Sequence, residues 1–215
     1  MSPQRRDRRS RSVAAMTQPL RIDFEGAFHH VVARGNGRGP IFLDDVDFRV
    51  FLRTFAAVVG KCDWACHAFC LLPNHYHLLL EMREPRLSEG MQLLNGLYAR
   101  RFNRRHQRQD HLFRARFRSV VVARESHALE TARYIPLNPV HAGLCTRPQD
   151  WPWSSYAATA GLHPSPPFLQ TSWLLDQFAR EPKRARELYR RFVADGLSPA
   201  ARLASFAFEF EGIAA

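Results

Sequence analysis

Hydrophobic side chains recur with two different periods along this chain, and the two periods separate predicted strands from predicted helices. Short apolar runs rich in branched and aromatic residues, typical of strands, occur at 28–34, 64–72, 75–82 and 117–122. Segments that open near Asp44, Ser88 and Ser126 repeat apolar residues every three or four positions, as amphipathic helices do. The order strand, helix, strand, strand, helix, strand is that of the split βαβ motif. The pattern predicts an α+β fold, a ferredoxin-like or RRM-like antiparallel sheet with helices packed on one face.

The remaining chain divides into an arm and an appendage around this domain. Residues 1–17 are rich in arginine and lack apolar periodicity, so we expect a disordered basic N-terminal arm. The folded domain is expected over 18–161. After the proline-rich linker at 163–167, two short amphipathic segments predict a C-terminal helical appendage and tail over 162–215. No apolar run is long enough to cross a membrane, and no signal peptide is evident, so we expect a cytoplasmic protein.

The charge of the chain points to a polyanionic partner. Five arginines and one aspartate in the first twelve residues account for +4 of the net charge of +11, so the remainder carries +7. A basic folded body favours nucleic acid, although a solvated basic surface is the alternative explanation. Cys62, Cys66, Cys70 and Cys145 show no Cys-x-x-Cys pair. We therefore expect free thiols in a reducing compartment and no zinc site.

The most informative stretch is the predicted hairpin at 69–82. Pro73 and Asn74 suit the two central positions of a tight turn. Side chains alternate across a strand, so His75 and His77 project to one face and Tyr76 to the other. Two imidazoles at this spacing can share one metal ion and leave positions open for substrate oxygens. The alternative is that both are partly buried histidines bonded to neighbouring groups.

Arginines are the candidate contacts to a nucleic-acid backbone. Some lie in or beside a glycine-rich loop, some follow the second predicted helix, where they also favour its negative end, and some interleave with aromatic residues that can stack on bases. The candidates are Arg34, Arg38, Arg100, Arg101, Arg104, Arg105, Arg114, Arg116 and Arg118.

The third predicted helix carries a candidate nucleophile. Tyr134 and Asn138 lie four residues apart, on the polar side of this helix. A phenol has a pKa near 10, so attack on a phosphodiester needs assistance, which a nearby cation supplies. The bland alternative is an ordinary amphipathic tyrosine. Pro136 and Pro139 remove two helical hydrogen bonds, so we expect a kink or an end of the helix there.

Four separated motifs together resemble one family. They are Arg34-Gly35-Asn36 with Pro40-Ile41-Phe42, the corner Leu72-Pro73-Asn74 with His75-Tyr76-His77, the run at 134–144, and Trp151-Pro152-Trp153-Ser154-Ser155-Tyr156. In this order, over about 19–161, the sequence resembles the REP-associated tyrosine transposases, a branch of the single-tyrosine HUH transposases. The resemblance implies an HUH-type endonuclease fold.

The resemblance also implies an activity and roles for particular residues. It implies a metal-dependent endonuclease and strand transferase that acts on single-stranded DNA near palindromic, REP-like hairpins, as a nucleoid-associated monomer or homodimer. His75, His77 and Asn138 would hold Mg²⁺ or Mn²⁺. Tyr134 would attack the scissile phosphate and form a 5′-phosphotyrosine link. Tyr76 occupies a position that the family usually fills with a small hydrophobic residue, so it is a rival nucleophile.

Two other functions remain open at this stage. The first is a catalytically inactive regulator that binds DNA hairpins on the same fold. The second is an RNA-binding module, because the sheet topology is shared with RNA readers, although the aromatic pairs on the central strands that such readers use are not evident.

Overall fold

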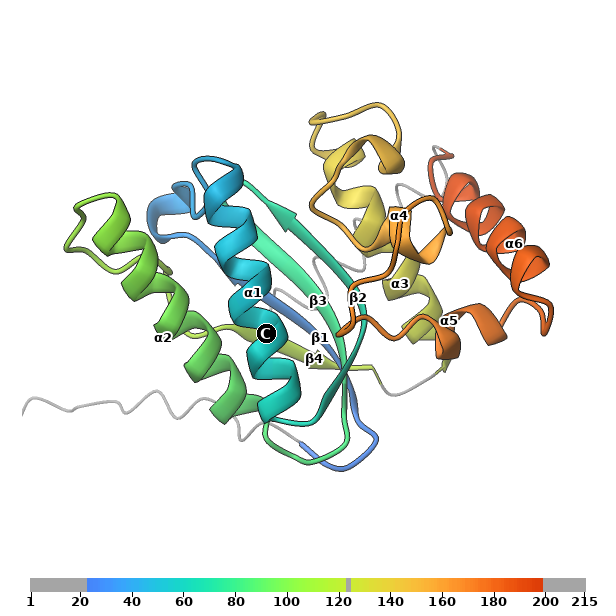
Figure 1. Ribbon diagram of the computed structural model, residues 1–215, viewed down its shortest axis with the longest axis horizontal. Coiled ribbons are helices and arrows are strands. Elements are labelled where there is room, and N and C mark those ends of the chain that lie inside the picture. Colours follow the sequence, from blue (N-terminus) through green and yellow to red (C-terminus); the bar gives the residue numbers. More distant parts are fainter. Residues whose placement is uncertain (1–22, 123–124, 199–215) are drawn as a thin grey trace, which may run out of the picture.

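Four antiparallel strands form the sheet on which the molecule is built. The computed structural model describes residues 23–122 and 125–198, and the predicted arm at 1–17 lies outside them. The strands are β1 (Phe28–Arg34), β2 (Trp64–Leu72), β3 (His75–Met82) and β4 (Arg118–Val121), in the order β2-β3-β1-β4 (Figure 1). β1 to β3 match their predicted bounds, while β4 is shorter than predicted. The central strands β3 and β1 therefore carry neighbours on both edges.

Two long helices cover one face of the sheet, as the sequence predicted. α1 (Asp45–Lys61) and α2 (Leu87–Arg105) pack on a core of aromatic and aliphatic side chains. Asp44 caps α1, since its carboxylate accepts hydrogen bonds from the next turn. α2 begins at Leu87, one residue before the predicted Ser88, because the Leu87 amide donates to the carboxylate of Asp23 at 2.9 Å. The start of α2 is thus set by a residue distant in sequence.

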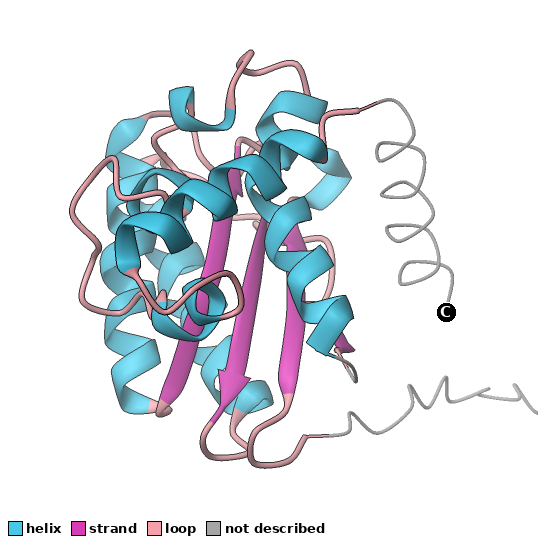
Figure 2. Ribbon diagram, turned by 90° about the vertical axis from the view of Figure 1, so that its right-hand side faces the viewer, coloured by secondary structure: helices cyan, strands magenta, loops and turns pink. Residues whose placement is uncertain are grey.

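Four further helices pack on the opposite side of the sheet. They are α3 (Glu125–His141), α4 (Tyr156–Thr159), α5 (Ser172–Asp176) and α6 (Pro182–Asp195), and two 3-10 turns, η1 (Asn36–Arg38) and η2 (Pro148–Asp150), complete the elements. Figure 2 views the sheet from this side, with the strands behind the helices. α3, α5 and α6 share a second hydrophobic cluster with β2 and β3. The domain boundary at 161 stays a prediction, but the predicted appendage adds its buried side chains to the cluster that α3 forms on the sheet.

α3 does not end at its prolines, so of the two expected outcomes, a kink or an end, the end is wrong and the kink stays a prediction. Pro136 and Pro139 both lie inside the helix. Pro139 has no amide hydrogen for the carbonyl of Ile135. The Asn138 side-chain nitrogen instead donates to that carbonyl at 3.4 Å and to the carbonyl of Tyr134 at 3.0 Å. This side chain replaces part of the missing backbone bonding and keeps positions 134 and 138 on one helical face.

The tryptophan-rich segment after α3 folds back onto β2. The indole nitrogen of Trp151 donates to the Leu71 carbonyl at 2.9 Å, and the Leu71 amide donates to the Trp153 carbonyl at 2.9 Å. Trp153 stacks on Phe48 of α1, with ring centroids 4.6 Å apart. Both tryptophans therefore serve packing. The four cysteines are free, as predicted, and three of them are buried.

None of the helices within the described ranges could serve as a transmembrane span. Such a span takes about 20 apolar residues in one helix.

Candidate active site

Strand alternation places the two predicted histidines on the face of the sheet that α3 covers. The rings of His75 and His77 lie 5.0 Å apart between centroids, and His77 is 1% exposed. Tyr76, between them, points to the opposite face, where it is fully buried and donates to the Asn95 side-chain oxygen at 2.6 Å. Burial raises the pKa of Tyr76. The rival nucleophile is therefore on the wrong face of the sheet, as alternation predicted.

One nitrogen of each histidine lies within hydrogen-bonding distance of a neighbour, which leaves the other nitrogen available to a ligand. His75 Nδ1 donates to the Asn74 side-chain oxygen at 2.6 Å, which leaves its Nε2 as the lone-pair nitrogen. His77 Nδ1 lies 3.0 Å from His30 Nε2. His77 Nε2 is buried, and it has no hydrogen-bond partner among the residues that the structure describes. A buried polar atom without a partner is costly, so this nitrogen is the strongest sign of an intended ligand.

The same burial keeps these imidazoles neutral. It lowers the pKa of His75 to about 4, with a smaller contribution from the Arg34 charge. It lowers the pKa of His77 well below its usual range, and the neighbouring His75, His30 and Arg34 act in the same direction. The pKa of His30 falls to about 4, again through burial. Neutral imidazole is the form that binds metal ions, so the site is in a metal-competent state at neutral pH.

α3 brings Tyr134 onto the histidines. Its ring centroid lies 5.6 Å from that of His77 and 6.1 Å from that of His30, in nearly perpendicular orientations. Its side chain is mostly buried, at 6% exposure. The ring of His141, two turns further along α3, lies 6.5 Å from Tyr134. The structure thus brings together the predicted tyrosine and the predicted histidine pair from two elements about 60 residues apart.

Asn138 lies one turn beyond Tyr134 with its oxygen uncommitted. Its nitrogen is held by the helix carbonyls, and its side-chain oxygen accepts no hydrogen bond from the described part of the chain. Within that part, no three His, Cys, Asp or Glu side chains are arranged to hold a metal ion. The donor set on offer is therefore two imidazole nitrogens and one amide oxygen. Such a set is compatible with a divalent cation that keeps further positions for water or substrate oxygens.

Sequence reasoning missed two histidines at this site, His30 and His141. His30 lies on β1, opposite Leu79 in the register with β3, and so diagonal to His77. The signal was in the sequence, because His30 shares its face of β1 with Arg34. This signal could be interpreted only with the knowledge that β1 lies beside β3.

Part of the predicted basic set lies beside the histidines. In the strand register His77 is opposite Val32, which is opposite Arg118, so all three form one row across the sheet. At about 5 Å per strand, Arg118 is about 10 Å from His77 along that row. Arg34 is opposite His75. On this β1–β4 half of the face Val120 is 42% exposed, so the surface beside the site is open to solvent.

The loops at the same end of the sheet add further predicted arginines. The Arg114 amide donates to the Arg34 carbonyl at 3.0 Å, which fixes the segment that holds Arg114 and Arg116 at the end of β1. The Arg38 carbonyl accepts from the Asn74 side chain at 3.1 Å, next to His75. The side chains of Arg38, Arg114 and Arg116 are exposed.

The four arginines of α2 are not brought to this site. Arg100, Arg101, Arg104 and Arg105 belong to a helix that covers the other face of the sheet. Arg105 is held by Asp44 at 2.6 Å and by the buried Asp47 at 2.7 Å. It joins α2 to the start of α1, so its nearest role is structural. DNA contact by these four residues stays a prediction.

Comparison with known proteins agrees with the fold. Residues 24–138, just over half of the chain, match the family described as "Transposase IS200 like". The solved structure of a REP-associated tyrosine transposase bound to a REP hairpin is similar, with a TM-score of 0.58 and 19% identity, over 69% of this chain and 89% of that one. A candidate transposase from Deinococcus radiodurans R1 matches with a TM-score of 0.40 and 19% identity, over 52% and 90% of the two chains. No curated protein matches.

The family match confirms the predicted family, and the similarity to the hairpin-bound transposase confirms the predicted fold class. The solved structure shows that the four-stranded sheet with its helices is a fold that tyrosine transposases use. The family match spans β1 to Asn138, and so it includes both histidines and the tyrosine. The chain belongs to the IS200-like transposase family.

Proposed function

We propose that this transposase is a metal-dependent endonuclease and strand transferase that cleaves single-stranded DNA next to palindromic hairpins through a 5′-phosphotyrosine intermediate. The observation that carries the proposal is the position of the Tyr134 ring over His77, whose buried Nε2 has no partner among the described residues. A phenol next to an imidazole nitrogen that has no partner among those residues suits attack on a phosphate that a cation at that nitrogen would hold.

The residues present fit a divalent cation. His75 Nε2, His77 Nε2 and the Asn138 oxygen would hold Mg²⁺ or Mn²⁺. The cation, when bound, would polarise the scissile phosphate and offset the charge that develops on its oxygens. Asn74 and His30 bond the far nitrogens of the two imidazoles. Such outer contacts set the ring orientation and the tautomer of metal-binding histidines.

The chain itself supplies the nucleophile and the hold on the strand. The Tyr134 phenol loses its proton, and its oxygen forms a bond to the phosphorus while the bond from phosphorus to the 3′ oxygen breaks. The departing 3′ oxygen takes up a proton and becomes a 3′-hydroxyl, and the 5′ phosphate stays on the tyrosine. Attack by a 3′-hydroxyl in the reverse sense releases the tyrosine and joins a strand. Arg34 and Arg118, in the rows of His75 and His77, are placed to hold the backbone.

A cleavage assay tests this proposal. The protein is incubated with an end-labelled single-stranded DNA that contains a hairpin and flanking sequence, in the presence of Mn²⁺. Wild-type protein is expected to give a cleaved strand and a covalent adduct that survives denaturing electrophoresis, and EDTA is expected to abolish both. Tyr134→Phe removes the nucleophilic oxygen, so it should form no adduct.

Tyr76→Phe is the matched control, because it makes the same change on the opposite face of β3. It should form adduct as the wild type does. Adduct formation by Tyr134→Phe at the wild-type level would overturn the assignment of the nucleophile. Tight, salt-sensitive hairpin binding without any adduct in the wild type would instead identify a catalytically inactive hairpin-binding regulator.

A further inference from the structure

The segment around α6 concentrates positive charge beyond the part of the chain that matches the family. Residues 180–191 hold six basic side chains and two glutamates, which amounts to +4 of the net charge of +11 on the chain. The family match ends at residue 138. The charge is therefore a feature of this chain's own C-terminal region, and the proposed cleavage at Tyr134 does not use it.

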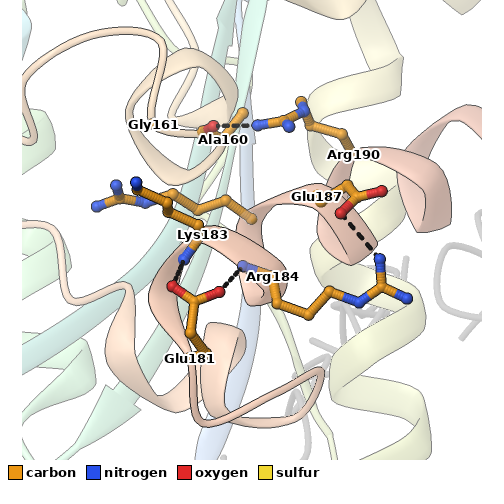
Figure 3. Close-up of a pocket in the computed structure, with 8 residues that line it drawn as sticks. Ala160, Gly161, Glu181, Lys183, Arg184, Glu187 and Arg190 are labelled. Atoms are coloured by element: carbon orange, nitrogen blue, oxygen red, sulfur yellow. Dashed lines mark hydrogen bonds and ion pairs between the residues drawn. The ribbon is translucent and has the colours of Figure 1, made fainter.

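Four of the six basic side chains and both glutamates line an open pocket between α6 and the end of α4 (Figure 3). The pocket has a volume of about 500 Å³ and is lined by Ala160, Gly161, Glu181, Lys183, Arg184, Arg186, Glu187 and Arg190. Arg190 donates to the Ala160 carbonyl at 2.9 Å. Gly161, with φ of +74°, lies so close to Arg186 that a Cβ there would be 2.6 Å from its Cδ. The loop after α4 thus closes tightly on two of the arginines.

The two glutamates of the pocket are already engaged, so positive charge remains. Glu181 caps α6 by accepting from the amides of Lys183 and Arg184, at 2.8 and 2.6 Å. Glu187 is shared by Arg184 and Arg191, each at 2.8 Å. Within the described residues, the side chains of Lys183 and Arg186 have no carboxylate partner, and both are exposed. These two cations are the ones that a ligand would meet without first breaking an ion pair.

α6 is held firmly on the helix that carries Tyr134. Tyr189 and Val193 of α6 are fully buried in the cluster that includes α3. The Arg133 guanidinium lies 4.8 Å from the centre of the Phe192 ring, a cation–π contact between the two helices. The basic surface is therefore fixed relative to the tyrosine, and a ligand bound there would be held in register with the cleavage site.

We propose that the α6 pocket, formed by Lys183, Arg184, Arg186 and Arg190, binds the phosphodiester backbone of the DNA substrate outside the strand held at Tyr134. The proposal rests on the proposed function for the identity of the substrate. The charged lining suits a polyanion, because cations that neutralise phosphates release the counterions condensed on them, and this release favours binding. The four cations line one pocket, while the apolar side of α6 stays buried in the core.

The experiment measures the salt dependence of DNA binding in a Tyr134→Phe background, where no cleavage is expected to interfere. The probe is a fluorescently labelled DNA hairpin with single-stranded flanks, and anisotropy gives the dissociation constant from 50 to 300 mM salt. The test variant is Lys183→Ala with Arg186→Ala. The control is Arg53→Ala with Lys61→Ala, which removes the same two residue types from exposed positions of α1 on the other side of the sheet.

The test variant should lose two phosphate contacts. The slope of the logarithm of affinity against the logarithm of salt concentration should become shallower by about 2, and affinity at 0.1 M salt should fall by about tenfold per contact. The control should keep the slope of its parent. All variants should melt within a degree or two of the parent, because the four side chains are exposed.

Two outcomes would overturn the proposal. One is an unchanged slope in the test variant, or an equal change in test and control, which would reduce the effect to overall charge. The other concerns polyglutamate. If the parent bound polyglutamate and the test variant did not, while the salt slope for DNA stayed the same in both, the pocket would be a site for an acidic protein. Absence of any adduct in the wild type would defeat the proposed cleavage, whereas the slopes would still decide whether the pocket binds DNA.

Discussion

His30 is expected to control metal affinity although it is not one of the proposed ligands. Its Nε2 lies 3.0 Å from His77 Nδ1, and within the described part of the chain this is the hydrogen bond that holds the buried His77 ring. With Nδ1 donating to His30, His77 Nε2 carries the lone pair that a cation needs. His30→Phe keeps a ring of similar size and removes the acceptor. The His77 ring then loses its fixed tautomer and orientation.

The expected loss of metal affinity follows from the kind of contact that the substitution removes. Removal of an outer hydrogen bond to a metal-binding histidine typically weakens metal affinity by about 10- to 100-fold, or about 1.4 to 2.7 kcal/mol. The value for His30 should lie toward the upper part of that range, because burial leaves His77 Nδ1 no water to replace the lost partner. His30→Gln offers an amide at similar reach and should recover part of the affinity.

The assay is calorimetric titration of Mn²⁺ into the protein without DNA, so the result does not depend on catalysis. His29→Gln is the control, since His29 lies next in the strand, faces the other side of the sheet and bonds Ser119 at 2.9 Å. It should lower stability and leave Mn²⁺ affinity within about twofold of wild type. If the Mn²⁺ affinity of His30→Phe also stayed within about twofold of wild type, the hydrogen bond with His30 would not influence metal binding by His77. The role inferred for His77 Nε2 would then lose its structural support.

Three further outcomes follow from the same structure. Tyr76→Phe should lower the free energy of unfolding by about 1 kcal/mol in urea titrations, because it removes one buried hydrogen bond. Arg105→Ala should lower it too, since the buried Asp47 loses an ion-pair partner, and it should leave hairpin affinity measured by anisotropy nearly unchanged. The pKa values of His30 and His75 fall from 6.5 to about 4 on folding, so the unfolded chain binds more protons in that window. Stability of the metal-free protein should therefore decline as pH drops from 6.5 to 4, by up to about 1.4 kcal/mol per pH unit for each imidazole, and these groups should leave it flat above 6.5.

Local signals in the sequence were sufficient where a single segment determines its own structure. The β2–β3 hairpin was predicted with its observed bounds, because Pro73 and Asn74 fix the turn and the alternation on either side fixes the faces. The same alternation correctly separated His77 from Tyr76. α1 began where predicted because its cap, Asp44, is adjacent in sequence.

The sequence was insufficient where a partner comes from a distant segment. The start of α2 depends on Asp23, which lies 64 residues before Leu87. Arg105 was assigned to DNA from its place in a basic run, but its carboxylate partners lie about 60 residues earlier, at the start of α1. His30 joined the site only through the pairing of β1 with β3. Each of these contacts requires knowledge of the topology, and no periodicity within one segment encodes it.

α3 shows how a rule that is correct for an isolated helix can mislead about a site. Pro139 does remove the hydrogen bond to the Ile135 carbonyl, and the expected cost is an unsatisfied buried acceptor. The Asn138 side-chain nitrogen donates to that acceptor, and so its oxygen is the atom left to serve as the proposed third metal ligand. Asn138→Leu should therefore destabilise α3 and also weaken Mn²⁺ binding. Asn138→Gln keeps the amide on a longer side chain, so it should retain the stability of α3 and the Mn²⁺ affinity to different extents.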